Sequence, residues 1–198
     1  MPGEKYGSYP AHPAHERVKD WTRVRYQNLR TGSQRVFIIS DQHLNHENIH
    51  EYCGRSEDWY RAVRSAWKMY VRPEDLVIDL GDVIFHNPGQ LDDYIKPLPG
   101  RKILVRGNHD KNPTQWYAAR GYDVVVDQFI MGPVVFNHRP MLKLPEGCEL
   151  CVHGHLHNNG WSDDYWAAVG YNQLYAIEYE KQSPQLLRDF LQAHDRLL

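Results

Sequence analysis

The chain has 198 residues, of which 41% are hydrophobic and 24% are charged, and this composition excludes a disordered or low-complexity protein. Its 23 Lys and Arg residues against 25 Asp and Glu residues leave a formal net charge of −2, which provides no overall basic field for holding duplex nucleic acid. The three cysteines argue against a disulfide framework, and no apolar run reaches the roughly 18–20 residues of a membrane span. The first residues lack the apolar core of a signal peptide, so we expect a cytoplasmic protein without membrane association.

The beginning of the chain differs in pattern from the rest. Residues 1–20 carry three prolines and two histidines without apolar periodicity, which predicts a flexible or loosely docked arm. Residues 21–198 show no linker and no internal repeat, and we expect them to form a single domain. Over residues 21–29, apolar side chains alternate with arginines, which predicts a half-exposed strand, and Thr31-Gly32-Ser33 supplies a turn for a hairpin.

Five short apolar runs follow, and each ends at a cluster of polar residues. Runs of this length, rich in β-branched residues, predict buried strands. The polar clusters occupy residues 40–43, 81–82, 107–110, 137–138 and 153–157. Because ligands of open α/β sheets gather at the carboxyl ends of strands, these clusters are the candidate site.

Between the early strands the pattern is helical. Ser56 can cap a helix with one apolar face, which ends at Pro73. Shorter helices are predicted over residues 90–96 and 114–120, the second with Gly121 after its end.

The second half of the chain is richer in strand patterns. Strands are predicted over residues 122–131, 133–137, 148–153 and 174–179. Ser183-Pro184 then opens a final amphipathic helix. Helices among the early strands and a β-rich second half together predict an α/β fold.

Seven side chains in the polar clusters offer carboxylate, amide or imidazole donors: Asp41, His43, Asp82, Asn108, His138, His155 and His157. A buried charge without a partner is costly, and metal ions would provide that partner. Seven donors exceed what one four-coordinate ion needs and suit two ions bridged by one carboxylate, for which Asp82 is the natural candidate. A donor set without thiolate favours Mn²⁺ or Fe²⁺, while the general affinity order leaves Zn²⁺ and Ni²⁺ possible.

The ordered motifs resemble those of the calcineurin-like metallophosphoesterases, in particular small single-domain members of bacterial or phage type. The family string is D-x-H, G-D, G-N-H-D/E, a lone H and G-H-x-H. Its counterparts here are Asp41-Gln42-His43, Gly81-Asp82, Gly107-Asn108-His109-Asp110, His138 and Gly154-His155-Leu156-His157. The resemblance implies a four-layer α-β-β-α sandwich, in which helices flank two mixed sheets. One departure is Asn137, which precedes His138 where Ser is common.

The resemblance also implies roles for these residues. Each ion would have three ligands of its own, Asp41, His43 and His157 for one and Asn108, His138 and His155 for the other. Asp82 would be shared, and His109 would polarise the phosphate or protonate the leaving group, so Asp82, Asn108 and His109 are the expected catalytic residues. The implied reaction is in-line attack of a metal-bridging hydroxide on a phosphodiester or small phosphomonoester, with no phospho-enzyme intermediate.

Two further side chains are candidates for contact with the substrate. His46 lies close behind the first motif, and Arg139 beside His138 could meet a phosphate oxygen, although a solvent-facing arginine fits the pattern equally well. Trp161, just after the last motif, is a candidate wall of the site's mouth, where its ring could stack on a base.

Two other functions remain open at this point. One is a metal-dependent nuclease of the same superfamily, acting on single strands or ends, with local basic groups at Arg55, Arg61, Arg64, Arg101 and Arg106. The other is a non-catalytic scaffold that binds proteins, which the complete donor set argues against. We expect a small phosphate ester as the partner and nucleic acid only as a possible substrate, with the oligomeric state undecided.

Overall fold

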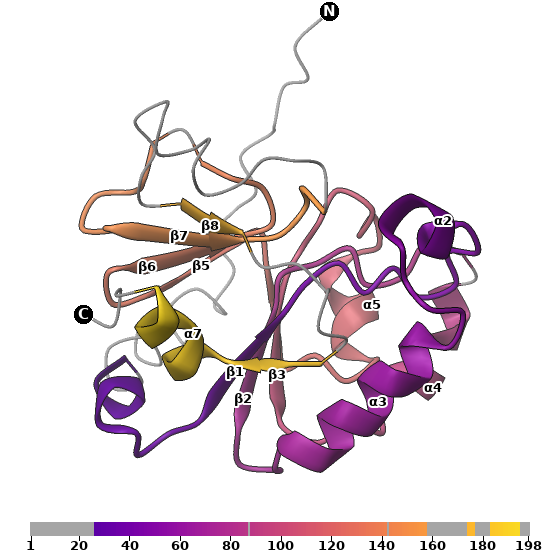
Figure 1. The fold of residues 1–198 in the computed structure, drawn as a ribbon, viewed down its shortest axis with the longest axis horizontal. Helices are drawn as coiled ribbons and strands as arrows, with labels where there is room; N and C mark the ends of the chain where they lie inside the picture. The colour runs from indigo at the N-terminus through magenta and orange to yellow at the C-terminus, as the bar shows by residue number, and fades with distance from the viewer. Residues whose placement is uncertain (1–25, 87, 142, 158–173, 177–182, 195–198) are drawn as a thin grey trace, which may run out of the picture.

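Two β-sheets packed face to face form the centre of the computed structural model, which describes residues 26–86, 88–141, 143–157, 174–176 and 183–194 (Figure 1). The first sheet has the order β4-β3-β2-β1-β9 and the second the order β5-β6-β7-β8. The strands of the first sheet are β1 (Val36–Ile39), β2 (Leu76–Asp79), β3 (Arg101–Val105), β4 (Val124–Val126) and β9 (Gln185–Leu186). Those of the second are β5 (Gln128–Met131), β6 (Val134–Asn137), β7 (Leu150–His153) and β8 (Leu174–Ala176).

Both sheets contain parallel and antiparallel pairs. In the first, β1 to β4 run parallel and β9 pairs antiparallel with β1. In the second, β5 pairs antiparallel with β6, while β6, β7 and β8 are parallel. The predicted fold class, with two mixed sheets and helices, is confirmed.

Four helices lie on one side of the first sheet (Figure 1), and they are α2 (Ile49–Cys53), α3 (Trp59–Tyr70), α4 (Leu91–Tyr94) and α5 (Thr114–Ala118). A short 3-10 helix, η1 (Pro88–Gln90), leads into α4. Alternate residues of each strand face opposite sides. Phe37 and Val77 therefore pack on the helices through Trp67, whereas Ile38 and Ile78 face the second sheet.

The space between the sheets is one of two large apolar cores, and the other lies between the first sheet and its helices. Phe129 and Phe136 of the second sheet close the core between the sheets from their side, and α7 (Leu187–Ala193) adds Leu187 and Leu191. Because β1 and β2 of the first sheet are buried on both faces, their sequences are nearly continuous apolar runs rather than alternating ones. This explains why the runs were recognisable as strands.

The strand predicted over residues 21–29 is wrong where the structure describes it. Residues 26–31 are helical, and Tyr26 and Leu29, three positions apart, bury their side chains in the core between the sheets. Gly32, with φ +74°, follows this turn of helix and ends it. The predicted hairpin is therefore also wrong. The burial of two apolar side chains on one face of a helix outweighs the local alternation of apolar and charged residues. Residues 21–25 and the predicted arm, residues 1–20, lie outside the described residues.

The single strand predicted over residues 122–131 is two strands in different sheets. β4 pairs with β3 in the first sheet, and β5 pairs with β6 in the second. Asp127, between them, forms an ion pair with Arg106 at 2.7 Å, next to the point where the chain crosses over. A continuous β pattern carries no signal for a change of sheet, since both halves have the same local preference.

Apart from their ends, the remaining predicted elements are present, and two elements that were not predicted are found as well. The helix predicted over 90–96 begins earlier, with η1, and ends at Tyr94, and the final helix begins at Leu187 after the unpredicted strand β9. α2 was not predicted either. Within the described ranges, no helix is both long enough and apolar enough to cross a membrane.

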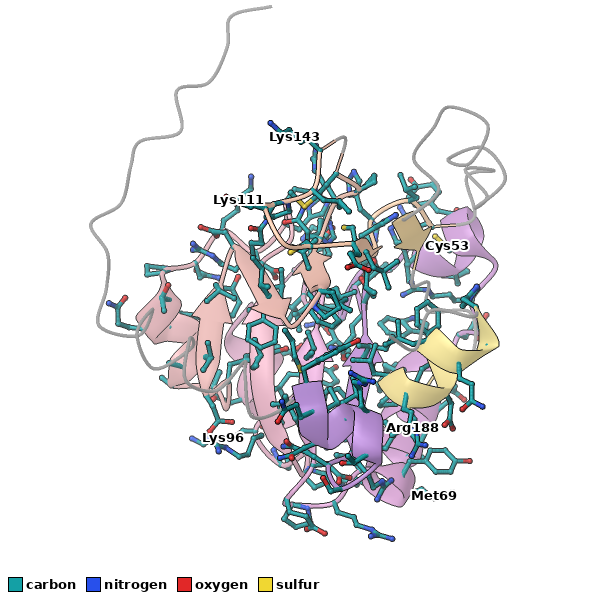
Figure 2. The ribbon with its side chains drawn as sticks, turned by 90° about the vertical axis from the view of Figure 1, so that its left-hand side faces the viewer. Cys53, Met69, Lys96, Lys111, Lys143 and Arg188 are labelled. Carbon is teal, nitrogen blue, oxygen red and sulfur yellow. The ribbon has the colours of Figure 1, made fainter. Side chains whose placement is uncertain are left out.

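The register brings the carboxyl ends of the central strands together. Asp79 pairs with Ile39 of β1 and with Leu104 of β3, and in the second sheet Asn137 pairs with His153. The loops after these strands therefore leave the sheets side by side. In Figure 2, Lys111 at the end of one such loop lies toward one end of the molecule, and Met69 near the end of α3 lies at the other.

Candidate metal centre

The loops that carry the predicted donors have an unusual backbone. Residues other than glycine are uncommon at positive φ, where Cβ crowds the neighbouring carbonyl group. Five predicted donors adopt it, namely Asp41 (φ 52°), His43 (φ 47°), Asp82 (φ 54°), His155 (φ 74°) and His157 (φ 48°). Asn45, at φ 60°, is the only other such residue in the described part of the chain. Conformations of this kind collect at functional sites, where the surrounding contacts hold them.

Asp41, His43 and His157 form the first donor group. Asp41 Oδ1 lies 3.7 Å from Nε2 of His43 and 3.5 Å from Nε2 of His157. The three side chains each offer an atom that could hold one metal ion. Burial lowers the pKa of His157, so its ring is neutral at pH 7 and has a lone pair to give.

The Asp41 carboxylate has one satisfied oxygen and one orphaned oxygen. Its Oδ2 accepts hydrogen bonds from the backbone N–H of His155, at 2.9 Å, and from the Ser40 hydroxyl. Oδ1 is buried and has no hydrogen-bond partner, and the same is true of both ring nitrogens of His43. Although burial alone would raise the pKa of Asp41, the neighbouring imidazoles hold it below its ordinary value. A buried carboxylate oxygen that lies near imidazole nitrogens and forms no hydrogen bond fits a cation.

The second donor group contains Asp82, His138 and His155, with Asn108 beside them. His138 Nε2 lies 3.3 Å from Asp82 Oδ2, 3.1 Å from Asn108 Oδ1 and 3.1 Å from His155 Nδ1. His138 Nδ1 lies 2.8 Å from the Leu80 carbonyl oxygen, which can only accept, so Nδ1 carries hydrogen and Nε2 faces the group. Burial lowers the pKa of His155 to about 4, so that ring is neutral at pH 7.

Asp82 lies between the two groups. Its Oδ2 is 3.3 Å from Nε2 of His138 and 3.8 Å from Nε2 of His43, which belong to different groups. Its Oδ1 accepts a hydrogen bond from the backbone N–H of His109 at 2.8 Å, which fixes the carboxylate plane. One oxygen of Asp82 therefore lies near imidazole nitrogens of both groups and could contact an ion held by either.

Asp110 fastens the loops that carry these donors. Its carboxylate accepts hydrogen bonds from the backbone N–H groups of Asp82 and Gly107, both at 2.8 Å, and of Val83 at 3.2 Å. Burial raises the pKa of Asp110 to about 6.

Gly154 allows close packing beside the first donor group, because a Cβ at this position would clash with the side chains of Ser40 and Asp41.

A buried network under the site contains a residue that the sequence analysis missed. Asp79 Oδ2 accepts hydrogen bonds from the Tyr122 hydroxyl and from Gln42 Nε2, each at 2.6 Å, and Oδ1 accepts one from the Gly81 N–H at 3.1 Å. Burial raises the pKa of Asp79 to about 7 in spite of these bonds. Gln42 lies between two donors, so the network links the first two donor loops. An aspartate inside an otherwise apolar strand was the available signal.

His109 and His46 lie at the open side of the donor groups. His109 Nε2 is 3.9 Å from Asp82 Oδ2, and its side chain is 39% exposed. The His46 ring centre lies 5.5 Å from that of His43 and stacks on Phe85 at 4.3 Å. Burial lowers the pKa of both rings, that of His46 to about 4, so both are neutral at pH 7.

Of the remaining predicted contacts, Arg139 is exposed and Trp161 is not among the described residues. The charge of Arg139 lies close enough to His155 to contribute to the lowered pKa of that ring. Asn137 donates a hydrogen bond to the Arg139 carbonyl oxygen at 2.7 Å.

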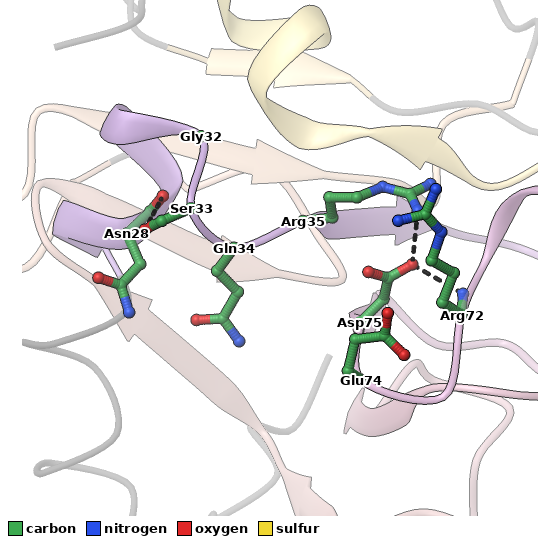
Figure 3. Close-up of a pocket in the computed structure, with 8 residues that line it drawn as sticks. All are labelled: Asn28, Gly32, Ser33, Gln34, Arg35, Arg72, Glu74 and Asp75. Carbon is green, nitrogen blue, oxygen red and sulfur yellow. Dashed lines mark hydrogen bonds and ion pairs between the residues drawn. The ribbon is translucent and has the colours of Figure 1, made fainter.

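A cavity of about 600 Å³ lies away from the donor groups, near the amino ends of β1 and β2 (Figure 3). Arg35 and Asp75 form an ion pair in its wall at 3.3 Å, and Arg35 also donates to the Tyr70 carbonyl oxygen at 2.6 Å. The guanidinium of Arg35 is therefore engaged within the protein, and the cavity has no contact with the metal donors.

A family model described as Calcineurin-like phosphoesterase matches residues 34–197. An uncharacterized protein of Methanocaldococcus jannaschii is 34% identical over 84 residues, which are 39% of this chain and 48% of that protein. The Gene 66 protein of Mycobacterium phage D29 is 35% identical over 82 residues, 38% of this chain and 40% of that protein. The match thus spans less than half the length of these two relatives.

A solved structure is similar to most of this chain. A protein of unknown function from Aquifex aeolicus has a crystal structure similar to this chain, with a TM-score of 0.68 and 26% sequence identity. The likeness covers 81% of this chain and 99% of that protein.

Proposed function

The chain belongs to the calcineurin-like phosphoesterase family, and we propose that it hydrolyses phosphodiesters or small phosphomonoesters with two divalent metal ions. The observation that carries this proposal is the position of Asp82 Oδ2, within 3.8 Å of imidazole nitrogens from both donor groups. The orphaned Oδ1 of Asp41 supports it, because a cation would satisfy that buried oxygen.

In this proposal each ion has its own ligands, Asp41, His43 and His157 for one and Asn108, His138 and His155 for the other, with Asp82 shared. Bound divalent ions supply a nucleophile at neutral pH and Lewis-acid polarisation of a phosphoryl oxygen. Carboxylate, amide and imidazole donors favour Mn²⁺ or Fe²⁺, and Zn²⁺ or Ni²⁺ would also fit these ligand types.

His109 is the proposed proton donor to the leaving group. Its backbone N–H is tied to Asp82, so the ring projects from a fixed position at the open side of the site. As a neutral imidazole the ring can hydrogen-bond a phosphate oxygen through its one N–H. To give a proton to the departing oxygen it must first take one up, and the neighbouring Asp82 carboxylate favours that protonated form by raising the pKa against the effect of burial. Asn108 shares the same loop, and its Oδ1 faces the second group.

The shared carboxylate can be tested by changing only its charge and its second oxygen. In protein stripped of metal and reloaded with Mn²⁺, Asp82→Asn should lower the hydrolysis of bis-p-nitrophenyl phosphate about 100-fold or more and should reduce the bound metal. Asp189→Asn, an exposed aspartate on α7, is the matched control and should behave as wild type. Full turnover and full metal content in Asp82→Asn would overturn the assignment.

The role of His109 can be separated from a purely structural one by the leaving group. A general acid contributes about 10²–10⁴-fold, and it matters most when the leaving oxygen is strongly basic. His109→Ala should therefore slow a dinucleotide, which expels an alkoxide, far more than an ester that expels p-nitrophenolate. Equal losses on both substrates would assign His109 to loop structure alone.

The two other functions differ in what they require. A nuclease of the same superfamily would use the same donors, although Arg55 and Arg106 already bind the Gln42 carbonyl oxygen and Asp127. A non-catalytic scaffold would have no need for a complete donor set. We therefore place hydrolysis of a small phosphate ester first.

A further inference from the structure

We propose that the stacked rings of Phe85 and His46 bind the nucleobase of the substrate, so that the preferred substrates are nucleotidyl phosphodiesters. This inference rests on the proposed phosphoesterase function and names the substrate class for the same site. It concerns the organic group of the ester, whereas the metal donors concern its phosphate.

The two rings belong to neighbouring loops, after β1 and after β2, that are joined by hydrogen bonds. The Phe85 N–H donates to the Leu44 carbonyl oxygen at 2.9 Å, and Leu44 and Ile84 form a parallel β-bridge. Asn45 Nδ2 donates to the His86 carbonyl oxygen at 3.1 Å and to Gln90 Oε1 at 2.7 Å. These bonds hold the loop after β1 and the loop after β2 together just beyond the donors. The two rings of Phe85 and His46, which we call the nucleobase platform, are therefore in position before a ligand binds.

The two rings lie next to the predicted metal donors, and neighbouring aromatic rings connect them to both donor groups. The ring centres of His46 and Phe85 are 4.3 Å apart, with 26° between their planes. Phe85 is 4.9 Å from His109 on one side, and His46 is 5.5 Å from the donor His43. A phosphate held at the donors would therefore place its ester substituent beside these two rings.

The exposure of the apolar rings points to a ligand. The described residues include four exposed large hydrophobic side chains, Tyr52, Met69, Tyr70 and Phe85. Phe85 is 37% exposed and stacks on His46. Tyr52 is 68% exposed, and the centre of its ring lies 5.9 Å from that of His46. The other two are at the end of α3, far from the donors, where Figure 2 shows Met69. Apolar rings kept in water beside a polar site are typical of a binding surface.

The neighbouring space fits a base better than a continuing phosphate backbone. His46 borders a hollow of about 430 Å³, whose wall also contains Tyr60, Tyr94, Glu47 and Glu57. The two carboxylates repel a second phosphate, while an uncharged planar ring meets aromatic neighbours. Stacking on aromatic side chains accepts any base, since every base has a π-face.

Two esters with the same leaving group isolate the contribution of the base. Thymidine p-nitrophenyl phosphate and methyl p-nitrophenyl phosphate differ only in the nucleoside, so the ratio of their kcat/KM values measures its recognition. With the Mn²⁺-loaded protein we expect a ratio of about ten or more in favour of the thymidine ester. Phe85→Ala should reduce this ratio about fivefold or more, and Phe85→Trp should retain it. Tyr70→Ala, which removes an exposed ring at the end of α3, is the matched control and should leave the ratio unchanged.

A binding measurement separates this inference from the function on which it rests. Calorimetry of the Mn²⁺-loaded protein should give tighter binding of thymidine monophosphate than of methyl phosphate, and Phe85→Ala should remove the difference. Equal hydrolysis of the two esters by wild type, or a ratio unaffected by Phe85→Ala, would overturn the nucleobase platform and leave the phosphoesterase standing. Hydrolysis of neither ester, with Phe85-dependent binding of the nucleotide, would support the platform and overturn the phosphoesterase.

Discussion

The Tyr122 hydroxyl donates a hydrogen bond of 2.6 Å to Asp79 Oδ2, and both side chains are buried beneath the proposed metal centre. Through Gln42 Nε2 and the Gly81 N–H, the same carboxyl group also holds the first two donor loops. A hydrogen bond between two residues outside the donor set thus supports the position of the donors.

Removal of the Tyr122 hydroxyl should weaken the fold. Tyr122→Phe takes away one buried donor and leaves Asp79 with fewer partners, so the free energy of unfolding should fall by about 1–3 kcal/mol. Urea denaturation at pH 7 measures this change. Tyr70→Phe, which alters an exposed tyrosine, is the control, and an equal stability of the two variants would contradict the importance of the network.

Asp79 should make the stability of the protein depend on pH. Its pKa is raised by burial from 3.8 to about 7, so folding favours the protonated carboxyl group. The contribution of Asp79 to the free energy of unfolding is therefore complete below about pH 4, and it is lost as the pH rises through 7. Compared with Asp79→Asn, the metal-free wild type should lose on the order of 3 kcal/mol between pH 4 and 8. Parallel stability curves for the two proteins would rule out the raised pKa.

Metal binding should release a proton from His138. Burial alone lowers the pKa of this ring, but Asp82, Asp41 and the Leu80 carbonyl outweigh it and raise the pKa to about 9. Below that pH a metal must displace the proton on Nε2, so Mn²⁺ affinity should rise with pH by up to about tenfold per unit. Calorimetry at pH 7.5, in buffers of different ionisation enthalpy, should show about one proton released. An observed heat that is independent of the buffer would disprove this coupling.

Gly154 should be needed for the first donor group. An added Cβ would clash with the side chains of Ser40 and Asp41, so Gly154→Ala must displace the Asp41 carboxylate or the loop that carries it. We expect a loss of about 1–3 kcal/mol in stability and weaker Mn²⁺ binding. Gly89→Ala is the control, because a Cβ there meets open space. Measured metal stoichiometry equal in both variants would show that the loop adapts.

Some sequence patterns were informative because they are short and local. A buried strand of four or five apolar residues has a recognisable composition, and the residue after it is known once the strand is known. Asp41 and Asp82 were therefore placed at strand ends correctly, and the parallel register brings those ends together. Tyr26 shows the opposite case, since its alternating neighbours suggested a strand although its burial partner, Leu29, is one helical turn away.

The order of the motifs and the chemistry of their side chains are properties of the amino-acid sequence alone, and they were enough to indicate the family, the donor types and the sheet class. The positive φ angles at the donors, the stacking of Phe85 on His46 and the link from Tyr122 to Asp79 were decided only by the tertiary structure. The physical reason is that strand and turn preferences act over a few neighbouring residues. Contacts between residues 37 to 43 positions apart depend on how whole sheets and loops pack.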